Sequence, residues 1–239
     1  MAATLGKIAD TMKRIEERFN QLADPGHAAG AKQFFREPTK FRGVRSPDLI
    51  HLSAELYRDV RDWNATERNE LCTLLWKRKP SEYGSLVCYL YRRFARSFSE
   101  PEFRLFEFWL NRYASNWGHC DGISIYLLAP SIGNVPRLAE DLRAWTASPN
   151  RWVRRAAAAG LVKEAKRGHH TELIFDVAQA LVNDPEDLVQ KGVGWMLKEA
   201  YPAKPGEVVA LLSRHPHWPR LILRYAAEKM SAEDKARIL

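Results

Sequence analysis

Cysteine and long apolar runs are scarce in this chain of 239 residues. The three cysteines, Cys72, Cys88 and Cys120, form no CxxC pair, and such an odd, scattered set argues against a disulfide framework and fits a reducing compartment. No apolar run approaches the roughly 18 residues of a membrane helix. Residues 1–19 form an amphipathic pattern of mixed charge without the apolar centre of a secretory signal. We therefore expect a cytoplasmic protein that binds no membrane.

The common short motifs of catalysis and metal binding are also missing. The sequence contains no P-loop, no GxSxG elbow, no HExxH pair and no zinc-finger spacing. His119, Cys120 and Asp121 are residue types that bind metals, but consecutive helical side chains point in different directions and cannot easily share one ion. We therefore expect no metal and no cofactor. An enzyme with this sequence would work with one carboxylate, aromatic rings and basic residues.

Hydrophobic and basic residues are plentiful. A hydrophobic content of 46%, with 11% aromatic residues, is enough for a sizeable core and excludes a disordered chain. Lys and Arg number 37 against 29 Asp and Glu, and the net charge of +8 favours a polyanionic partner such as nucleic acid. A basic surface without a nucleic-acid partner is the other interpretation. The excess charge is spread evenly along the sequence, so it could serve nucleic acid only if folding gathers it on one face.

Apolar residues recur at spacings of three and four over most of the chain, which predicts an all-α protein. The expected helices span residues 5–22, 28–35, 47–61, 65–77, 83–98, 101–113, 116–128, 135–146, 149–167, 171–183, 185–201, 205–213, 219–230 and 232–238. Ser46, Ser148 and Asp184 each precede a proline, a pattern that predicts a capping side chain followed by proline at the first helical position. No linker rich in Gly, Ser or Pro divides the chain, so we expect one domain over residues 1–239.

A weak internal repeat relates two of these helical segments. The stretch "SPNRWVRRAAAAGLVKEA" from Ser148 resembles "DPEDLVQKGVGWMLKEAY" from Asp184, at an offset of 36 residues. Prolines, apolar residues and small residues match, and Arg155 matches Lys191. A period of this length, built from helix pairs, predicts an α-solenoid of HEAT-like repeats, curved with a basic concave face.

Trp117 and Asp121 lie four residues apart in "NWGHCD", a spacing that places them on one face of a helix. A carboxylate in an otherwise apolar helix needs a partner or a function. Two interpretations stay open on spacing alone. Asp121 either caps a neighbouring helix or pairs with an arginine, or it is a catalytic acid.

Three further segments also allow a structural and a functional interpretation. In "RWVRRAAA", Arg155 either packs against an acid of the adjacent repeat, or clamps a phosphate or pairs with Asp121. In "GVGWMLKEAY", two glycines leave space around Trp195, which is either a core residue or the aromatic wall of a concave site. In "FRGVRSP", a helix start beside Arg42 and Arg45 suits a phosphate, although the motif is weak by itself.

Four segments of the chain, in this order, resemble the AlkD family of alkylpurine DNA glycosylases, which are built from HEAT-like repeats. They are "FRGVRSP", "NWGHCD", "NRWVRRAA" and "LVQKGVGWMLKEAY". The family patterns are F-x-G-[VI]-x-[ST]-P, W-x-x-x-D, x-W-x-x-R-A-A and Q-K-A-[IV]-G-W-x-L-[RK]-E, of which the last is the most specific. The resemblance covers nearly the whole chain and implies the same helical-repeat fold.

The resemblance also implies roles for individual residues. It makes Asp121 the catalytic aspartate, and Trp117 and Trp195 the tryptophans that flank the sugar of the damaged nucleotide. The DNA-binding residues that it implies, extended by two neighbouring basic residues, are Arg155, Arg45, Ser46, Lys198, Lys191 and Arg154.

This chain departs from the family at several positions. A tyrosine on an early helix has no clear counterpart here, and Gln33 is the nearest residue. Arg45 replaces a shorter polar residue, and residues 118–120 fill the W-x-x-x-D interval with types of this chain's own. The Trp, Asp and Arg set is complete, however, whereas the resemblance implies that superfamily members without it bind DNA and excise nothing.

The implied reaction is hydrolysis of the N-glycosidic bond of cationic N3- or N7-alkylated purines in double-stranded DNA. The expected enzyme is a monomeric, monofunctional glycosylase of base excision repair. Such a purine leaves readily, so one carboxylate, Asp121, suffices to stabilise the oxocarbenium-like sugar and position water. The alternatives are a non-catalytic DNA-binding HEAT-repeat protein and a scaffold for protein partners.

Overall fold

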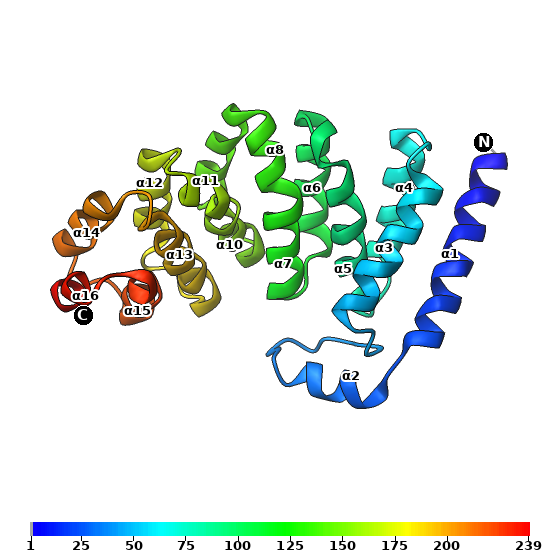
Figure 1. Ribbon diagram of the computed structural model, residues 1–239, viewed down its shortest axis with the longest axis horizontal. Helices are drawn as coiled ribbons and strands as arrows, with labels where there is room; N and C mark the ends of the chain where they lie inside the picture. Colours follow the sequence, from blue (N-terminus) through cyan, green and yellow to red (C-terminus); the bar gives the residue numbers. More distant parts are fainter. Residues whose placement is uncertain (1) are drawn as a thin grey trace. The chain divides into compact units, whose positions relative to one another are not determined.

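The computed structural model describes residues 2–239, with side chains from Gly6 onward, as a succession of helices (Figure 1). Within this range no residue belongs to a β-strand, and an isolated bridge pairs Lys40 with Pro80. The predicted all-α class is therefore confirmed.

The chain forms two compact units. The first contains the chain up to Ala95 together with Arg112–His119, and the second contains Arg96–Asn111 and Cys120–Leu239. The expectation of a single domain over residues 1–239 is not tested by this division into two units and stays a prediction.

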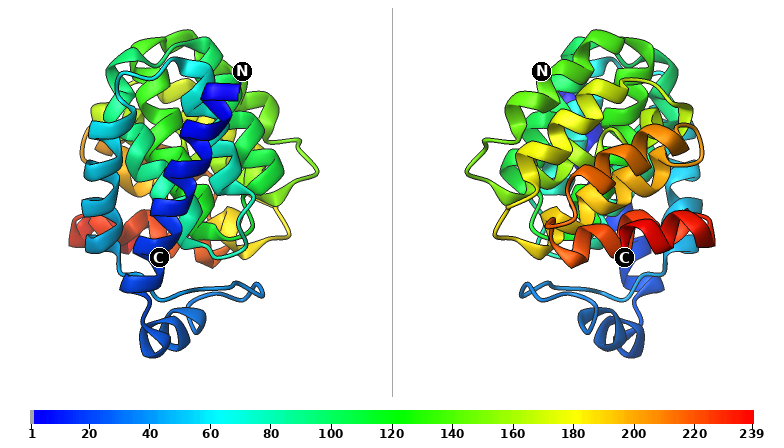
Figure 2. Two further views of the ribbon diagram at one scale, coloured as in Figure 1. Left: turned by 90° about the vertical axis from the view of Figure 1, so that its right-hand side faces the viewer. Right: turned by 90° about the vertical axis from the view of Figure 1, so that its left-hand side faces the viewer.

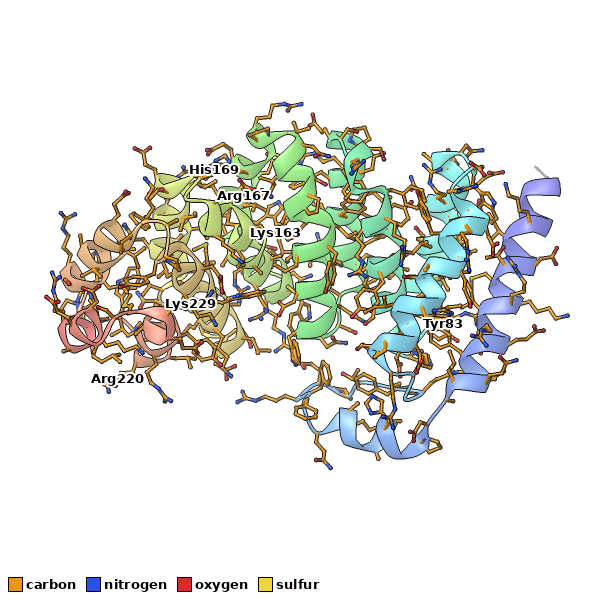
Figure 3. The ribbon with its side chains drawn as sticks, viewed as in Figure 1. Tyr83, Lys163, Arg167, His169, Arg220 and Lys229 are labelled. Carbon is orange, nitrogen blue, oxygen red and sulfur yellow. The ribbon has the colours of Figure 1, made fainter. Side chains whose placement is uncertain are left out.

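The first unit is built around α5 (Glu82–Tyr91). Its helices are α1 (Ala2–Leu22), α2 (Pro25–Lys32), α3 (Ser46–Val60), α4 (Ala65–Trp76), α5 (Glu82–Tyr91) and the first turn of α7 (Trp117–Ile123), with most of the 3₁₀ segment Arg92–Ser97. α5 packs against α3 and α4. Tyr83 of α5, labelled in Figure 3, stacks on Phe19 with ring centroids 4.1 Å apart. This aromatic pair and the fully buried Leu71 and Leu86 belong to the core of the unit.

The second unit is built around α13 (Asp187–Ala200). Its helices are most of α6 (Glu100–Tyr113), the rest of α7, α8 (Ala129–Asn134), α9 (Asp141–Trp145), α10 (Arg151–Ala159), α11 (Val162–Arg167), α12 (Thr171–Leu181), α13 (Asp187–Ala200), α14 (Pro205–Arg214), α15 (Arg220–Ala226) and α16 (Ala232–Ile238). α13 packs against α10, α11, α12 and α15. Figure 2 shows α14 and α16, in orange and red, beside one another near the C-terminus. The small side chains of residues 156–159 are fully buried and let α10 lie close to its neighbours.

The helix expected over residues 116–128 is interrupted directly after the segment that holds Asp121. α7 ends at Ile123, a π-helix covers Ser124–Leu128, and α8 follows. Pro130 explains the change, because it lacks an N–H group and its ring clashes with the carbonyl four residues earlier. The backbone widens instead, and the Ala129 N–H donates to the carbonyl of Ser124, five residues back.

The three predicted helix caps are wrong. Ser46 is the first residue of α3 and caps nothing. The side chains of Ser148 and Asp184 each accept the backbone N–H two residues later, at 3.2 and 2.9 Å, and so close local turns. α10 and α13 therefore begin later than expected, and Asn150 is the cap of α10. The helix expected over 149–167 is also divided, into α10 and α11.

Candidate active site

Asp121 and Arg155 form a two-point ion pair within the second unit. Nε of Arg155 donates to Oδ1 of Asp121 and Nη2 donates to Oδ2, both at 2.8 Å. This fork geometry fixes the plane of the carboxylate as well as its position. The Arg155 side chain is 8% exposed, whereas 20% of the Asp121 side chain remains exposed. A buried cation therefore orients the Asp121 carboxylate, and part of the Asp121 side chain remains accessible to solvent.

The buried guanidinium stays charged in this setting. Desolvation acts to lower the pKa of Arg155, but the hydrogen bonds and charge of Asp121 more than offset it and leave that pKa raised. Nη1 of Arg155 also donates to the carbonyl of Leu188 on α13. These contacts anchor the guanidinium on both Asp121 and α13.

The Arg155 side chain packs against α13 at Gly192, where the absence of a side chain leaves room for it. A Cβ atom at this glycine would lie 3.5 Å from Cγ of Arg155 and 3.7 Å from its Nη1. A side chain much larger than alanine would compete with the guanidinium for this space. The expectation that both glycines of α13 leave open space around Trp195 is wrong, because Gly194 lies against α15, where an added Cβ would meet Cβ of Tyr225 at 2.5 Å.

Trp195 lies half-buried on α13, three residues after Gly192. Residues three apart are neighbours on a helix surface. Trp195 therefore lies next to the part of α13 that meets Arg155, within the same unit.

Trp117 is the first residue of α7 and belongs to the first unit. Its ring stacks on Phe35, with centroids 5.1 Å apart and planes 12° from parallel. Its Nε1 donates to the carbonyl of Phe34 at 3.2 Å. One face of the indole is therefore covered, and the half-buried ring is held in a defined plane. Asp121 also falls within α7, as the sequence predicts.

Arg45, at the end of the loop that precedes α3, and Ser46, the first residue of α3, are exposed to solvent. The Arg45 side chain is 62% exposed, and its Nη2 lies 3.1 Å from Oδ2 of Asp24. Gly43 has φ of +87°, and a Cβ there would lie 1.9 Å from the Asp24 carbonyl oxygen, so only glycine fits. The position of the loop is thus set by the backbone.

The remaining predicted cations are paired in the structure. Arg154 donates from Nε and Nη2 to Asp184 at 2.6 and 3.2 Å, and its side chain is only 15% exposed. The hydrogen bonds to Asp184 raise the pKa of Arg154. Lys191 lies 3.6 Å from Asp187, and Lys198 lies 2.8 Å from Glu228. A phosphate at any of these residues would have to compete with a carboxylate.

Comparison with known proteins now identifies the family. A family model described as DNA alkylation repair enzyme matches residues 15–230. The chain belongs to this family. The resemblance inferred from the four sequence segments is thereby confirmed.

Solved structures share the fold of this DNA alkylation repair protein. A predicted DNA alkylation repair enzyme from Enterococcus faecalis is 18% identical, with a TM-score of 0.80 over 88% of this chain and 97% of that chain. AlkD2 from Streptococcus mutans is 15% identical, with a TM-score of 0.59 over 78% of this chain and 90% of that chain. At these identities the likeness establishes the fold alone. No curated protein sequence matches the chain.

Two further observations concern what this family member could bind. In the described part of the chain, no three His, Cys, Asp or Glu side chains lie close enough to hold a metal ion. None of the helices described is long and apolar enough to cross a membrane.

Two buried polar residues of the first unit, Glu82 and His119, were not predicted as site residues from the sequence. Glu82 is 5% exposed and His119 is 7% exposed, and both contact the segments that carry predicted site residues of the first unit. A charged residue at the start of an otherwise apolar helix, as in "SEYGSLVCYL", is the only signal in the sequence for Glu82.

Proposed function

We propose that this DNA alkylation repair protein is a monofunctional DNA glycosylase, acting on cationic N3- or N7-alkylated purines in duplex DNA. The observation that carries the proposal is the Asp121 carboxylate, which Arg155 orients at two points while 20% of the side chain stays exposed. A carboxylate has about four lone-pair sites, of which the arginine fork occupies two. The others are available to water and to a positively charged sugar.

The reaction requires only one acid. Alkylation gives the purine a positive charge, so the C1′–N bond breaks with its electron pair moving to the purine, which leaves neutral. The sugar becomes oxocarbenium-like, and the negative charge of Asp121 stabilises it. Asp121 also accepts a hydrogen bond from the water that forms the new C1′–O bond, and the released proton passes to the carboxylate or to solvent.

Trp117 and Trp195 would flank the sugar in this mechanism. An aromatic face near a developing positive charge adds cation–π stabilisation. The stacking of Trp117 on Phe35 supports such a role. Phe35 covers one face of the indole and fixes the plane of the ring, so the opposite face has a defined orientation.

DNA would be held through its phosphates. The exposed Arg45 and Ser46 at the start of α3 are the best placed for this, since a helix start offers free N–H groups as well as the cation. Arg155, Arg154, Lys191 and Lys198 are further proposed DNA contacts, and at each of them a phosphate would compete with the carboxylate that pairs with the residue in the structure. We further propose that the protein acts as a monomer, in the cytoplasm and without a cofactor.

A non-catalytic DNA-binding protein is the second candidate. The observation in its favour is the same ion pair, since an aspartate bound at two points by a buried arginine also fits a purely structural role.

Release of free bases from methylated duplex DNA separates the two candidates. A glycosylase releases 7-methylguanine or 3-methyladenine and leaves abasic sites, and EDTA does not change the rate. Salt-sensitive binding without release of these bases would favour the non-catalytic candidate, while no DNA binding at all would contradict both.

A further inference from the structure

The beginning of α5 contacts both segments of the first unit that carry predicted DNA contacts. One segment runs from Lys40 to Ser46, the first residue of α3, and is here called the entry loop. The other is the first turn of α7, which begins at Trp117. Ser81, which immediately precedes α5, donates its backbone N–H to the carbonyl of Lys40 at 2.8 Å. Its carbonyl and hydroxyl oxygens each lie 2.9 Å from Nε2 of His119, on the first turn of α7.

Glu82 pins the entry loop. Its Oε1 accepts the backbone N–H groups of Arg42 and Gly43 at 2.8 and 2.7 Å. Hydrogen bonds to a charged group are stronger than neutral ones, and this carboxylate is almost fully buried. Because Gly43 also adopts a left-handed conformation against Asp24, the path of the chain is fixed two residues before Arg45.

His119 pins the first turn of α7. Since the carbonyl of Ser81 can only accept, Nε2 of His119 carries the hydrogen in this contact. Asn116 caps the helix by accepting the backbone N–H of His119 at 3.0 Å, and its Nδ2 donates to the Ser81 hydroxyl at 3.1 Å. Trp117 lies between Asn116 and His119 in sequence, so its backbone is held on both sides.

The packing around His119 leaves it little freedom. The ring meets Trp76 edge-on, with centroids 5.1 Å apart. A Cβ at Gly84 would lie 2.8 Å from Nε2 of His119 and 2.3 Å from the Trp76 ring, so this glycine lets the histidine reach α5. The packing of α5 against the first turn of α7 therefore determines the contact between Ser81 and His119.

We propose that Ser81 and Glu82 form a positioning bracket, which holds the entry loop and the first turn of α7 in a fixed relation. On this view Glu82 positions the phosphate contacts of Arg45 and Ser46, and the Ser81–His119 contact positions Trp117 for the sugar. Neither Glu82 nor His119 needs to touch DNA. The inference rests on the proposed function, and it adds residues that act through others.

The test compares two disruptive variants with their conservative partners. Glu82→Ala removes the carboxylate acceptor, whereas Glu82→Gln keeps an oxygen for the loop amides. His119→Phe keeps a ring but loses the bond to Ser81, whereas His119→Gln keeps an N–H of similar reach. Glu70→Ala, at an exposed acid of α4, is the control for the lost charge. For each protein, thermal unfolding, Kd for alkylated duplex DNA and the single-turnover excision rate are measured.

If the bracket holds the two segments, the Glu82 variant should change mainly the Kd for DNA, and the His119 variant should change mainly the excision rate. Glu82→Ala should weaken DNA binding about tenfold, the effect of roughly 1.4 kcal/mol, with little change in the excision rate of the bound complex. His119→Phe should slow excision about tenfold and leave Kd nearly unchanged. The glutamine variants should recover most of each loss, and Glu70→Ala should match the wild type.

Two outcomes would overturn the bracket. One is that the folded variants keep wild-type Kd and rate. The other is that the disruptive variants lose stability, and the glutamine variants, although stable, recover neither binding nor rate. Failure of the proposed function is a separate result, because it appears as an inactive wild type before any variant is compared. The binding arm with Glu82 then still decides whether the entry loop is positioned from α5.

Discussion

Arg154 and Arg155 are neighbours on α10, and each grips an aspartate at two points. The aspartates of the two pairs differ in their exposure to solvent. Asp184, the partner of Arg154, is 3% exposed and also accepts the backbone N–H of Glu186 at 2.9 Å, whereas Asp121 is 20% exposed. The first carboxylate is enclosed by the turn it stabilises, and the second presents an open side. Access to solvent, rather than the presence of an ion pair, separates a structural acid from a candidate catalytic one.

The enclosed pair should carry the largest stability effect. Asp184→Ala leaves Arg154 without its partner and removes a turn contact, and breaking such a buried pair costs about 3–5 kcal/mol. Urea unfolding monitored by circular dichroism measures this loss. A loss below about 1 kcal/mol would mean that the pair contributes no more than a surface ion pair does.

The buried histidine of the first unit offers a contrast with these ion pairs, because it is uncharged. Burial lowers the pKa of His119 from 6.5 to about 4. Below pH 6.5 the unfolded chain binds a proton that the folded protein does not bind until about pH 4, so stability falls as the pH drops through this window. The contribution of this one group approaches about 3 kcal/mol.

Unfolding free energies at pH 7 and pH 4.5 test this expectation. The pH dependence should be weaker in His119→Gln, which has no titrating ring, than in the wild type. Equal pH dependence in the two proteins would show that His119 is not the group responsible.

The two glycines of α13 have different surroundings. Gly194→Ala should cost about 1–3 kcal/mol, since its Cβ would overlap Tyr225 at 2.5 Å. Gly192→Ala should be neutral or stabilising by up to about 1 kcal/mol, because its Cβ makes ordinary contacts with Arg155 and alanine favours helix. Thermal unfolding of the two variants gives the answer, and a reversed order would contradict the packing described for α13.

The smallest effect is expected at Arg45, which is exposed and weakly paired. Arg45→Ala should leave stability within about 0.5 kcal/mol of the wild type. It should reduce the slope of log K against log salt for duplex DNA by about 1, the loss of one phosphate contact. An unchanged slope would remove Arg45 from the interface.

The sequence was sufficient for the helical class and for the family, because periodicity and four ordered segments are local signals. It also raised Arg155 as a possible partner of Asp121, and the structure confirms this pairing. The hydrogen bond from the Gly43 N–H to the Glu82 carboxylate joins residues 39 positions apart, and no local sequence pattern predicts it. The same holds for Lys198 and Glu228, 30 positions apart. Predicted caps failed where a serine or aspartate closed a turn of its own before the helix began.

The central claim is that Asp121 acts on the substrate, and the two pairs of α10 provide a matched test. Asp121→Asn and Asp184→Asn each remove one charge from an arginine fork and keep an acceptor oxygen. Single-turnover excision of 7-methylguanine from duplex DNA, with Kd measured alongside, compares them. If Asp121 acts on the substrate, Asp121→Asn should lose at least about 10²-fold in rate at nearly unchanged Kd, and folded Asp184→Asn should keep a near wild-type rate. Excision by Asp121→Asn at the rate of Asp184→Asn would contradict this role of Asp121.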